Sequence, residues 1–259
     1  EMDTLADEAY PQKIAKATKE LGCRSVAYTY NDPVIFMEYA IDVAKECRKY
    51  DIRSVAVTAG YITEEPRSEF FRYMDAANID LKGFTEEFYF KTCSGHLQPV
   101  LDTLKYVKDK TDVWLEITTL LIPGLNDSDK ELEQMAQWVM TNLGPDVPWH
   151  FTGFYPTWKM LNIPPTSEAT LTRARAIAMK AGVRYAYTGN VSDEAGGSTY
   201  CRQCGNKLIG RNAYNITEWH LSEDGLCNAC ATPCAGVFED SPGTWGAKRQ
   251  PIRMKDFVV

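Results

Sequence analysis

Strand-like and helix-like segments alternate along most of the 259 residues, with short connections between them. Runs of valine, threonine and tyrosine are followed by segments whose apolar residues recur at helical spacing. Because a parallel pair of strands needs a crossover that is usually a helix, this order predicts a parallel sheet covered by helices. The expected strands are 25–30, 54–58, 78–81, 113–122, 148–155 and 183–188, and the expected helices are 11–21, 33–50, 67–75, 97–108, the segment after Ser128, and 168–181.

The pattern opens on the helix at 11–21, although a strand normally begins each β/α unit. The first residue is Glu1 rather than methionine. We therefore expect an N-terminal truncation, with the missing strand upstream of Glu1. The predicted fold is a partial (β/α)6 TIM-like barrel that lacks its first strand. Within it, Ser128 and Glu131 match a capping box, which predicts the start of a helix.

Composition and charge exclude several classes of protein. The chain is 44% hydrophobic with a formal net charge of −7, as in ordinary globular proteins. It has neither the long apolar run of a membrane span nor the opening segment of a signal peptide, so we expect a cytoplasmic protein without membrane contact. Lysine and arginine are not clustered, and we do not expect nucleic-acid binding.

The segment 192–198 (SDEAGGS) marks a break in composition and predicts a linker. Before it lies a predicted α/β domain at 1–191. After it lies a predicted small module at 199–259, which carries seven basic and six acidic side chains. That module has little helical periodicity and many turn residues, so its hydrophobic core is expected to be small. Such a module needs a covalent cross-link or a bound metal ion for stability.

The spacing of the cysteines indicates a metal site that could provide this stability. Cys201 and Cys204 form one C-x2-C pair, and Cys227 and Cys230 form a second pair 22 residues further on. Two such pairs are typical of zinc ribbons and rubredoxin-like modules, where four thiolates surround one ion. We predict that these four cysteines bind zinc in preference to iron, although tetrahedral thiolate sites accept both.

Cys234 allows a different interpretation. Together with Cys227 and Cys230 it reads C-x2-C-x3-C, a spacing that could indicate an iron–sulfur triad. A triad would leave both Cys201 and Cys204 unassigned as ligands, whereas the two-pair interpretation leaves only Cys234 unassigned. The two-pair interpretation is therefore preferred.

Polar residues follow nearly every predicted strand, where parallel α/β folds bind their ligands. Tyr30, Asn31 and Asp32 follow the first strand. Asp80 and Lys82 end the third strand two residues apart, so both side chains point to the same face. A charged pair on an inward face is costly unless it meets a ligand or each other. Cap and turn chemistry also accounts for single positions of this kind, so the strand ends alone leave both interpretations open.

Four segments occur in a characteristic order: AYTYNDP at 27–33, TAGY at 58–61, DAANIDLKG at 75–83 and TLLIPGLND at 119–127. Together they resemble the radical S-adenosylmethionine (SAM) enzymes akin to pyruvate formate-lyase activating enzyme. The cysteine-rich tail is similar to the C-terminal ribbon of the AmmeMemoRadiSam-system branch. The resemblance covers nearly the whole chain, and the combination of motifs is specific even though each motif alone is weak.

The resemblance implies a SAM site at the strand ends. Tyr30, Asn31 and Asp32 match the motif that holds the methionyl amino group of SAM. Lys82 matches the lysine that pairs with the SAM carboxylate, and Asp80 matches the aspartate beside it. Asp32 stands where the family more often has glutamate.

The same resemblance assigns the adenosine end of SAM. Thr118 and the turn that begins at Ile122 match the region that lines ribose and adenine. Tyr155 stands where relatives often have histidine, and we count it with the cofactor-binding residues.

The implied activity of the intact protein is reductive cleavage of SAM at a [4Fe–4S] cluster. The resulting 5′-deoxyadenosyl radical would abstract hydrogen from a substrate, for which a glycyl position of a partner protein is one candidate. The chain holds no C-x3-C-x2-C triad, so the resemblance implies cluster ligands upstream of residue 1 and an inactive fragment without them. The alternative is a non-catalytic zinc-binding α/β protein whose ribbon docks a protein partner.

Overall fold

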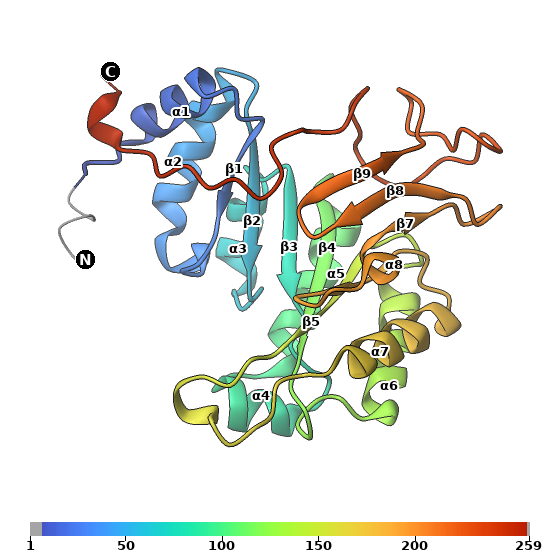
Figure 1. Cartoon of the computed structure of the whole chain (residues 1–259). Coiled ribbons are helices and arrows are strands. Elements are labelled where there is room, and N and C mark those ends of the chain that lie inside the picture. The colour runs from blue at the N-terminus through green and yellow to red at the C-terminus, as the bar shows by residue number, and fades with distance from the viewer. Residues whose placement is uncertain (1–6, 258–259) are drawn as a thin grey trace. The chain divides into compact units, whose positions relative to one another are not determined.

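The computed structural model describes residues 7–257 (Figure 1). Six strands form one sheet in the order β1-β2-β3-β4-β5-β6, and three more form a second sheet in the order β7-β8-β9. The pairs β1–β2, β2–β3, β4–β5 and β5–β6 are parallel. The predicted α/β class with a parallel sheet is therefore confirmed.

The strands of the large sheet are β1 (Ser25–Tyr28), β2 (Arg53–Thr58), β3 (Ala76–Asp80), β4 (Trp114–Leu121), β5 (Trp149–Gly153) and β6 (Ala186–Gly189). The longer helices are α1 (Pro11–Glu20), α2 (Met37–Arg48), α3 (Glu64–Phe71), α4 (Glu86–Cys93), α5 (Leu97–Lys110), α6 (Asp129–Asn142) and α7 (Glu168–Ala181). No helix within residues 7–257 has both the length and the apolar character to cross a membrane.

The chain divides into two compact units, each of which is described by itself. The first comprises the described residues within Glu1–Asp80, Gln98–Leu115 and Arg249–Val259. The second comprises Leu81–Leu97 and Glu116–Lys248. This division does not follow the predicted boundaries at residues 191 and 198, and those domain boundaries stay a prediction.

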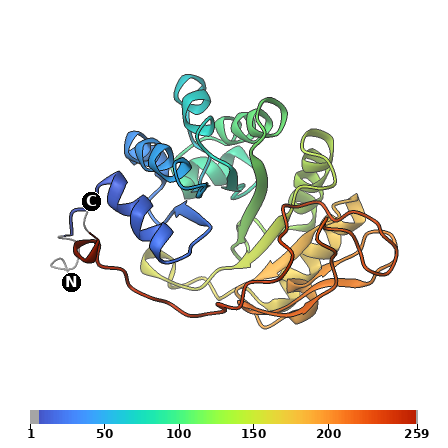
Figure 2. The ribbon, with the colours of Figure 1, turned by 90° about the horizontal axis from the view of Figure 1, so that it is seen from above.

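In the first unit, α2 packs against β2. Strand β2 alternates buried and less buried residues, as expected for a strand with one face on a core. Helices α1 and α2 lie side by side (Figure 2), and the short turn η4 (Met254–Asp256) contacts α1. Phe70 and Phe71 of α3 are fully buried and form an edge-to-face pair at 5.2 Å between ring centroids.

In the second unit, the two faces of the sheet differ in character. On one face, the side chains of β4 and β5 are buried, among them Ile117, Trp149 and Phe151. Helix α7 packs against β5. Helices α6 and α7 lie next to each other (Figure 1). On the opposite face Glu116, Thr118, His150 and Thr152 are half-buried and polar, and Leu120 is exposed.

The predicted start of α6 is confirmed, but only half of its capping box forms. The Ser128 hydroxyl accepts a hydrogen bond from the Glu131 N–H at 3.3 Å. The Glu131 carboxylate does not reach back to Ser128 and instead accepts from the Phe84 N–H at 2.6 Å. Glu131 is buried, so it needs a strong donor, and the loop after β3 provides one. Burial raises the pKa of this carboxyl.

Three helices differ from the prediction, and the first is the helix expected at 33–50, which is a short 3-10 turn, Pro33–Phe36, followed by α2. Helix α4 was not predicted, although the Thr85 hydroxyl caps it by accepting from the Phe88 N–H and two glutamates occupy its first turn. Helix α3 begins three residues before the predicted 67, because Pro66 lies in its first turn, where proline is tolerated.

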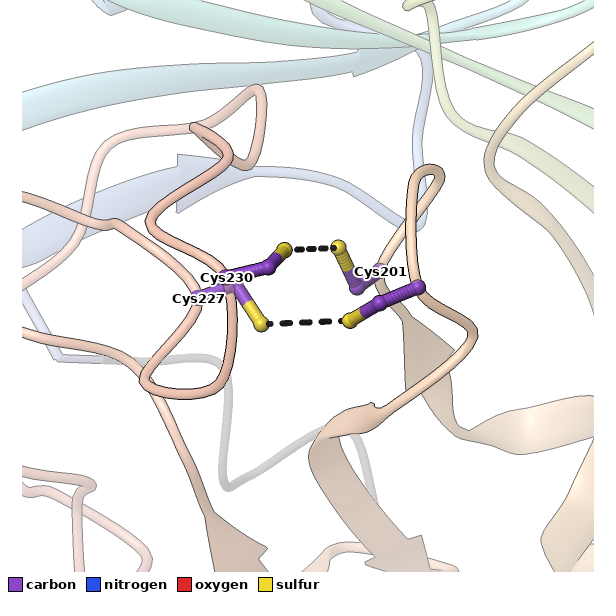
Figure 3. A group of neighbouring side chains, drawn as sticks. Cys201, Cys227 and Cys230 are labelled. Carbon is purple, nitrogen blue, oxygen red and sulfur yellow. Dashed lines mark hydrogen bonds between the residues drawn. The ribbon is translucent and has the colours of Figure 1, made fainter.

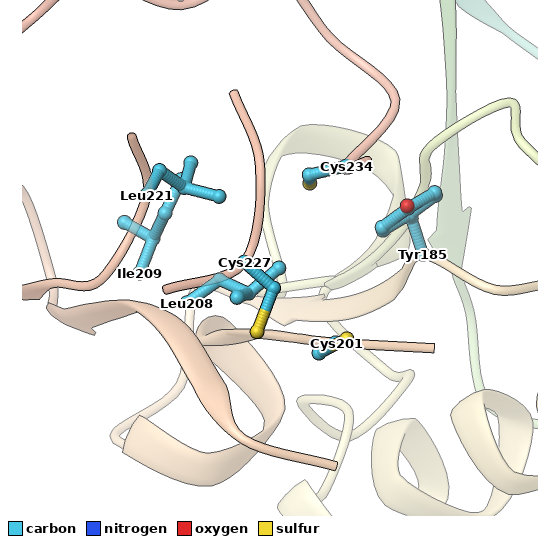
Figure 4. Close-up of a cluster of buried hydrophobic side chains, with 7 residues drawn as sticks. All are labelled: Tyr185, Cys201, Leu208, Ile209, Leu221, Cys227 and Cys234. Atoms are coloured by element: carbon cyan, nitrogen blue, oxygen red, sulfur yellow. The ribbon is translucent and has the colours of Figure 1, made fainter. Parts of the chain in front are cut away.

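The cysteine-rich segment forms a small antiparallel sheet of β7 (Thr199–Tyr200), β8 (Lys207–Asn212) and β9 (Asn215–Trp219). The predicted linker contains the short helix α8 (Glu194–Gly197), which Asp193 caps. A buried cluster joins this sheet to the chain just before β6 (Figure 4). Its members are Tyr185, Cys201, Leu208, Ile209, Leu221, Cys227 and Cys234.

Candidate functional site

The four cysteines of the two C-x2-C pairs come together in the second unit. Their sulfur atoms all lie within 4.8 Å of one another. The Sγ atoms of Cys201 and Cys230 are 3.6 Å apart, and those of Cys204 and Cys227 are 3.7 Å apart (Figure 3). Among residues 7–257, these four side chains form a group that could hold a metal ion.

The sulfur separations fit a single ion. A tetrahedron with metal–sulfur bonds of about 2.3 Å has edges of about 3.8 Å, close to the two shortest separations. In a four-iron cluster each thiolate binds a different iron, so the sulfurs would have to lie much farther apart. The geometry therefore accepts one zinc or one iron and does not fit a [4Fe–4S] cluster.

The two halves of this group share one turn geometry. The Gly205 N–H donates to the Cys201 carbonyl at 2.9 Å, and the Ala231 N–H donates to the Cys227 carbonyl at 2.8 Å. Gly205 and Ala231 both have positive φ, +73° and +58°. Each turn thus brings the two sulfurs of its pair to the same side.

Burial and charge differ within the group. Cys201 and Cys227 are buried, whereas Cys204 and Cys230 are exposed. Hydrogen bonding with the hydroxyl and the N–H of Thr232 lowers the pKa of Cys230 to about 6. Because the thiolate is the form that binds metal, one ligand is already prepared at neutral pH.

Cys234 and His220 have other partners. Cys234 is buried beside Tyr185 in the cluster of Figure 4, and burial raises the pKa of its thiol. His220 Nδ1 lies 2.8 Å from the Lys207 carbonyl oxygen. The group of metal-capable side chains described above includes neither residue.

The predicted SAM residues of the first unit lie at the ends of β1, β2 and β3. The Asp32 carboxylate accepts three hydrogen bonds: from the Val34 N–H at 3.0 Å, the Thr58 hydroxyl at 2.8 Å and the Ala59 N–H at 2.7 Å. The bonds from Thr58 and Ala59 join the loop after β1 to the end of β2. Tyr30 is 99% exposed with φ +70°, and Asn31 beside it is exposed.

Asp80 and Lys82 belong to different units. Asp80 is the half-buried last residue of β3 in the first unit. Lys82 is the second residue of the second unit, where its N–H donates to the Tyr89 hydroxyl at 3.0 Å and its carbonyl accepts from Asn126 Nδ2 at 2.6 Å. The main chain at Lys82 is thereby fixed on both sides.

Asn126 is a positioning residue that sequence reasoning missed. It is fully buried, and its Oδ1 accepts from the N–H of Ile122 at 2.7 Å. Its Nδ2 donates to the carbonyls of Lys82 and Leu120. The only sequence signal was its place in the turn after β4, where an asparagine is ordinarily a turn former.

The remaining predicted residues also lie in the second unit. Thr118 is half-buried on β4, and Ile122 is buried just after that strand. Tyr155 is exposed and donates from its hydroxyl to the Asn190 carbonyl at 3.0 Å. Within this unit the structure therefore connects Lys82 to Ile122 through Asn126, while Tyr155 bonds to the loop after β6.

Comparisons with known proteins identify relatives along the chain. The model of a family described as the Radical SAM superfamily matches residues 3–139. An uncharacterized protein of Methanocaldococcus jannaschii is 37% identical over 224 residues, which are 86% of this chain and 66% of that protein. The 4-hydroxyphenylacetate decarboxylase activating enzyme of Clostridium scatologenes is 27% identical over 120 residues, 45% of this chain and 38% of that enzyme. The chain thus spans less than two thirds of either relative.

Solved structures support the fold. A domain of pyruvate-formate lyase-activating enzyme from Bacteroides vulgatus superposes with a TM-score of 0.56 at 20% identity, over 64% of this chain and 98% of that domain. Streptococcus suis SuiB bound to S-adenosylmethionine gives a TM-score of 0.55 at 13% identity, over 69% of this chain and 42% of SuiB. At these identities the likeness shows the fold alone.

Proposed function

Because the chain belongs to the radical SAM superfamily, we propose that it forms the SAM-binding core of an enzyme of the activating type. The activity of the intact protein would be reductive cleavage of SAM, followed by hydrogen abstraction from a substrate. The observation that carries the proposal is the set of three hydrogen bonds that the Asp32 carboxylate accepts, two of which, from Thr58 and Ala59, tie the loop after β1 to the end of β2. Both segments belong to the motifs of the SAM site.

The residues of this chain do not fit the iron–sulfur cluster of the superfamily. The sequence contains no C-x3-C-x2-C triad, and the four clustered thiols lie too close together for four irons. No step of the reaction is therefore assigned to a residue of this chain. Cluster ligands upstream of Glu1 stay a prediction, which the coding sequence before the Glu1 codon tests directly.

Binding of SAM by the chain itself tests the core of the proposal. Lys82→Met keeps the length of the side chain and removes its charge, while Lys91→Met makes the same change at an exposed ion pair on α4. A hydrogen bond to a charged group contributes about 1.5–3 kcal/mol, so equilibrium dialysis with SAM should show about 10- to 100-fold weaker binding for Lys82→Met only. Equal affinities for the two variants, or no binding by the wild type, would overturn the proposal.

We further propose zinc at the four cysteines, with a structural role. The small antiparallel sheet has few buried side chains of its own, and a metal that ties its two turns supplies the missing stability. Metal analysis of purified protein should find one zinc per chain. If the analysis instead finds one iron per chain, the same four ligands hold a rubredoxin-like iron rather than zinc.

The alternative is a zinc-binding protein without SAM chemistry, whose ribbon docks a protein partner. It predicts one metal ion per chain and no binding in the SAM dialysis, so the two measurements together separate the hypotheses. A protein substrate and a cytoplasmic location belong to the main proposal, the latter because a reducing compartment keeps the four thiols available to metal.

A further inference from the structure

The Thr58 hydroxyl is a buried link between two segments of the first unit. Thr58 is the last residue of β2 and is only 3% exposed. Its Oγ1 donates to the Asp32 carboxylate at 2.8 Å and accepts from the Gly60 N–H at 3.0 Å. Because a carboxylate only accepts, the single hydroxyl hydrogen is committed to Asp32. A relay of hydrogen bonds therefore runs from Gly60 through Thr58 to Asp32.

The start of this relay is packed closely against β3. Gly60 has a φ of +66°, which lies in the left-handed region that favours glycine. A Cβ atom at Gly60 would lie 2.7 Å from Cγ2 of Ile79, so the turn has no room for a side chain. Ile79 is fully buried and is the register partner of Thr58 on β3. The core of the unit thus holds the Gly60 N–H in place against the Thr58 hydroxyl.

The end of the relay leaves the Asp32 carboxylate with little acceptor capacity. Its Oδ1 accepts from the Val34 N–H at 3.0 Å and from Thr58, and its Oδ2 accepts from the Ala59 N–H at 2.7 Å. The two oxygens of a carboxylate offer about four lone-pair sites. The three bonds occupy both sites of Oδ1 and one site of Oδ2. The one acceptor site that remains therefore belongs to Oδ2.

We propose that Thr58 is a positioning residue for SAM, which acts through Asp32 and selects Oδ2 as the atom that accepts from the methionyl amino group. The inference rests on the proposed function, because only the family resemblance assigns that amino group to Asp32. Asp32 is half-buried, whereas Thr58 is enclosed and acts without touching the ligand. Without the Thr58 hydroxyl, Oδ1 regains an acceptor site and the carboxylate loses one of the bonds that fix its plane.

The short side chain of Asp32 is part of this geometry. Its carboxylate caps the 3-10 turn Pro33–Phe36 through the Val34 N–H, two residues further on, while it also reaches Thr58 and Ala59. A glutamate carboxylate would extend one C–C bond, about 1.5 Å, farther from the main chain and would lose part of this set of bonds. Asp32→Glu should therefore weaken the hold on the amino group, although glutamate is the residue that the family more often has here.

The test compares SAM with its desamino analogue, in which hydrogen replaces the α-amino group. Equilibrium dialysis with the full chain gives the ratio of the two affinities, which reports the contact of the amino group alone. The wild type should prefer SAM by about 10-fold or more, as expected for a hydrogen bond between charged groups. Thr58→Val replaces the hydroxyl with a methyl group and should lower this ratio by about fivefold or more. Thr58→Ser retains the hydroxyl and should keep the wild-type ratio.

Thr103→Val is the matched control within the same unit. Thr103 is fully buried, and its hydroxyl donates to the Pro99 carbonyl, one turn earlier on α5, at 2.9 Å. It packs near the same turn, since a Cβ atom at Gly60 would lie 3.7 Å from Thr103 Cγ2. This variant should keep the wild-type ratio. Unfolding midpoints establish that each variant has folded, and if Thr58→Val does not fold, Asp32→Glu gives the same comparison with the same expected fall in the ratio.

A merely structural role of Thr58 weakens SAM and its analogue equally and leaves the ratio unchanged, and that result would refute the inference. A lower ratio in Thr103→Val, or an undiminished ratio in Asp32→Glu, would refute it as well. If the wild type binds both ligands with equal affinity, SAM binding stands and only the inference is wrong. If the wild type binds neither ligand, the proposed function itself is wrong.

Discussion

Replacing Asn126 with alanine removes a buried side chain on which two predicted cofactor residues depend. In the folded protein its amide bonds to the N–H of Ile122 and to the carbonyls of Lys82 and Leu120. No water reaches this side chain, because its exposed fraction is 0%. The loss of the amide therefore leaves main-chain groups without replacement partners.

The cost follows from the kind of group that is left behind. An N–H has a single hydrogen to donate, so the orphaned Ile122 N–H costs about 1–3 kcal/mol. A carbonyl has two lone pairs, so Lys82 and Leu120 each lose about 0.5–1.5 kcal/mol. We expect the free energy of unfolding to fall by about 2–6 kcal/mol, a large part of the stability of an ordinary domain.

Urea unfolding followed by tryptophan fluorescence and circular dichroism measures this loss. Asn142→Ala is the matched control, because it removes one half-buried bond, from Nδ2 to the Trp138 carbonyl at 2.9 Å near the end of α6. That control should lose about 1 kcal/mol or less. If Asn126→Ala and Asn142→Ala lose the same free energy, the reasoning about Asn126 is refuted.

Four further outcomes are expected. Cys227→Ser should abolish metal binding while Cys234→Ser keeps one ion per chain, as measured by plasma mass spectrometry; equal metal contents would contradict the assigned ligands. In metal-free protein at pH 7, iodoacetamide should modify Cys230 before the other exposed thiols, because Thr232 lowers the pKa of Cys230 to about 6; peptide mass spectrometry gives the order, and added zinc should suppress the reaction. Asp32→Asn should lower the free energy of unfolding by about 1–3 kcal/mol and weaken SAM in dialysis, because the carboxylate accepts three bonds; unchanged values would leave Asp32 without a role. Burial raises the pKa of Glu131 above its ordinary 4.5, so the protonated carboxyl contributes fully to stability at lower pH, and this contribution is lost as the pH rises through the raised pKa. Glu131→Gln should therefore flatten that part of the plot of unfolding free energy against pH. An unchanged slope would assign the pH dependence to another group.

Periodic features of the sequence predicted the fold well. The alternation of strand-like and helix-like segments predicted the parallel sheet, because burial of one face of a strand or helix requires apolar residues at regular spacing in the sequence. The group of four cysteines could also be predicted from the sequence, since two C-x2-C pairs fix the local turns that Gly205 and Ala231 complete.

Contacts between distant segments left no such trace. Asn126 and Lys82 are 44 residues apart, and Glu131 and Phe84 are 47 apart, so neither pairing follows from local spacing. Helix α4 was missed because it is a single short helix with only two buried residues, Phe88 and Tyr89. The pairing of Glu116 with His150 needs the register of β4 against β5, which a single sequence does not supply.

The last described turn of the chain, η4, contacts α1, its first described helix. A ribosome releases residues in order, so this contact forms only after the whole cysteine ribbon has emerged. The ribbon can therefore capture its metal before the first unit is complete. Ending the chain before residue 199 would remove η4 together with the ribbon and damage both units at once. Substitution of single ligand cysteines, rather than truncation, is the way to learn what the metal contributes.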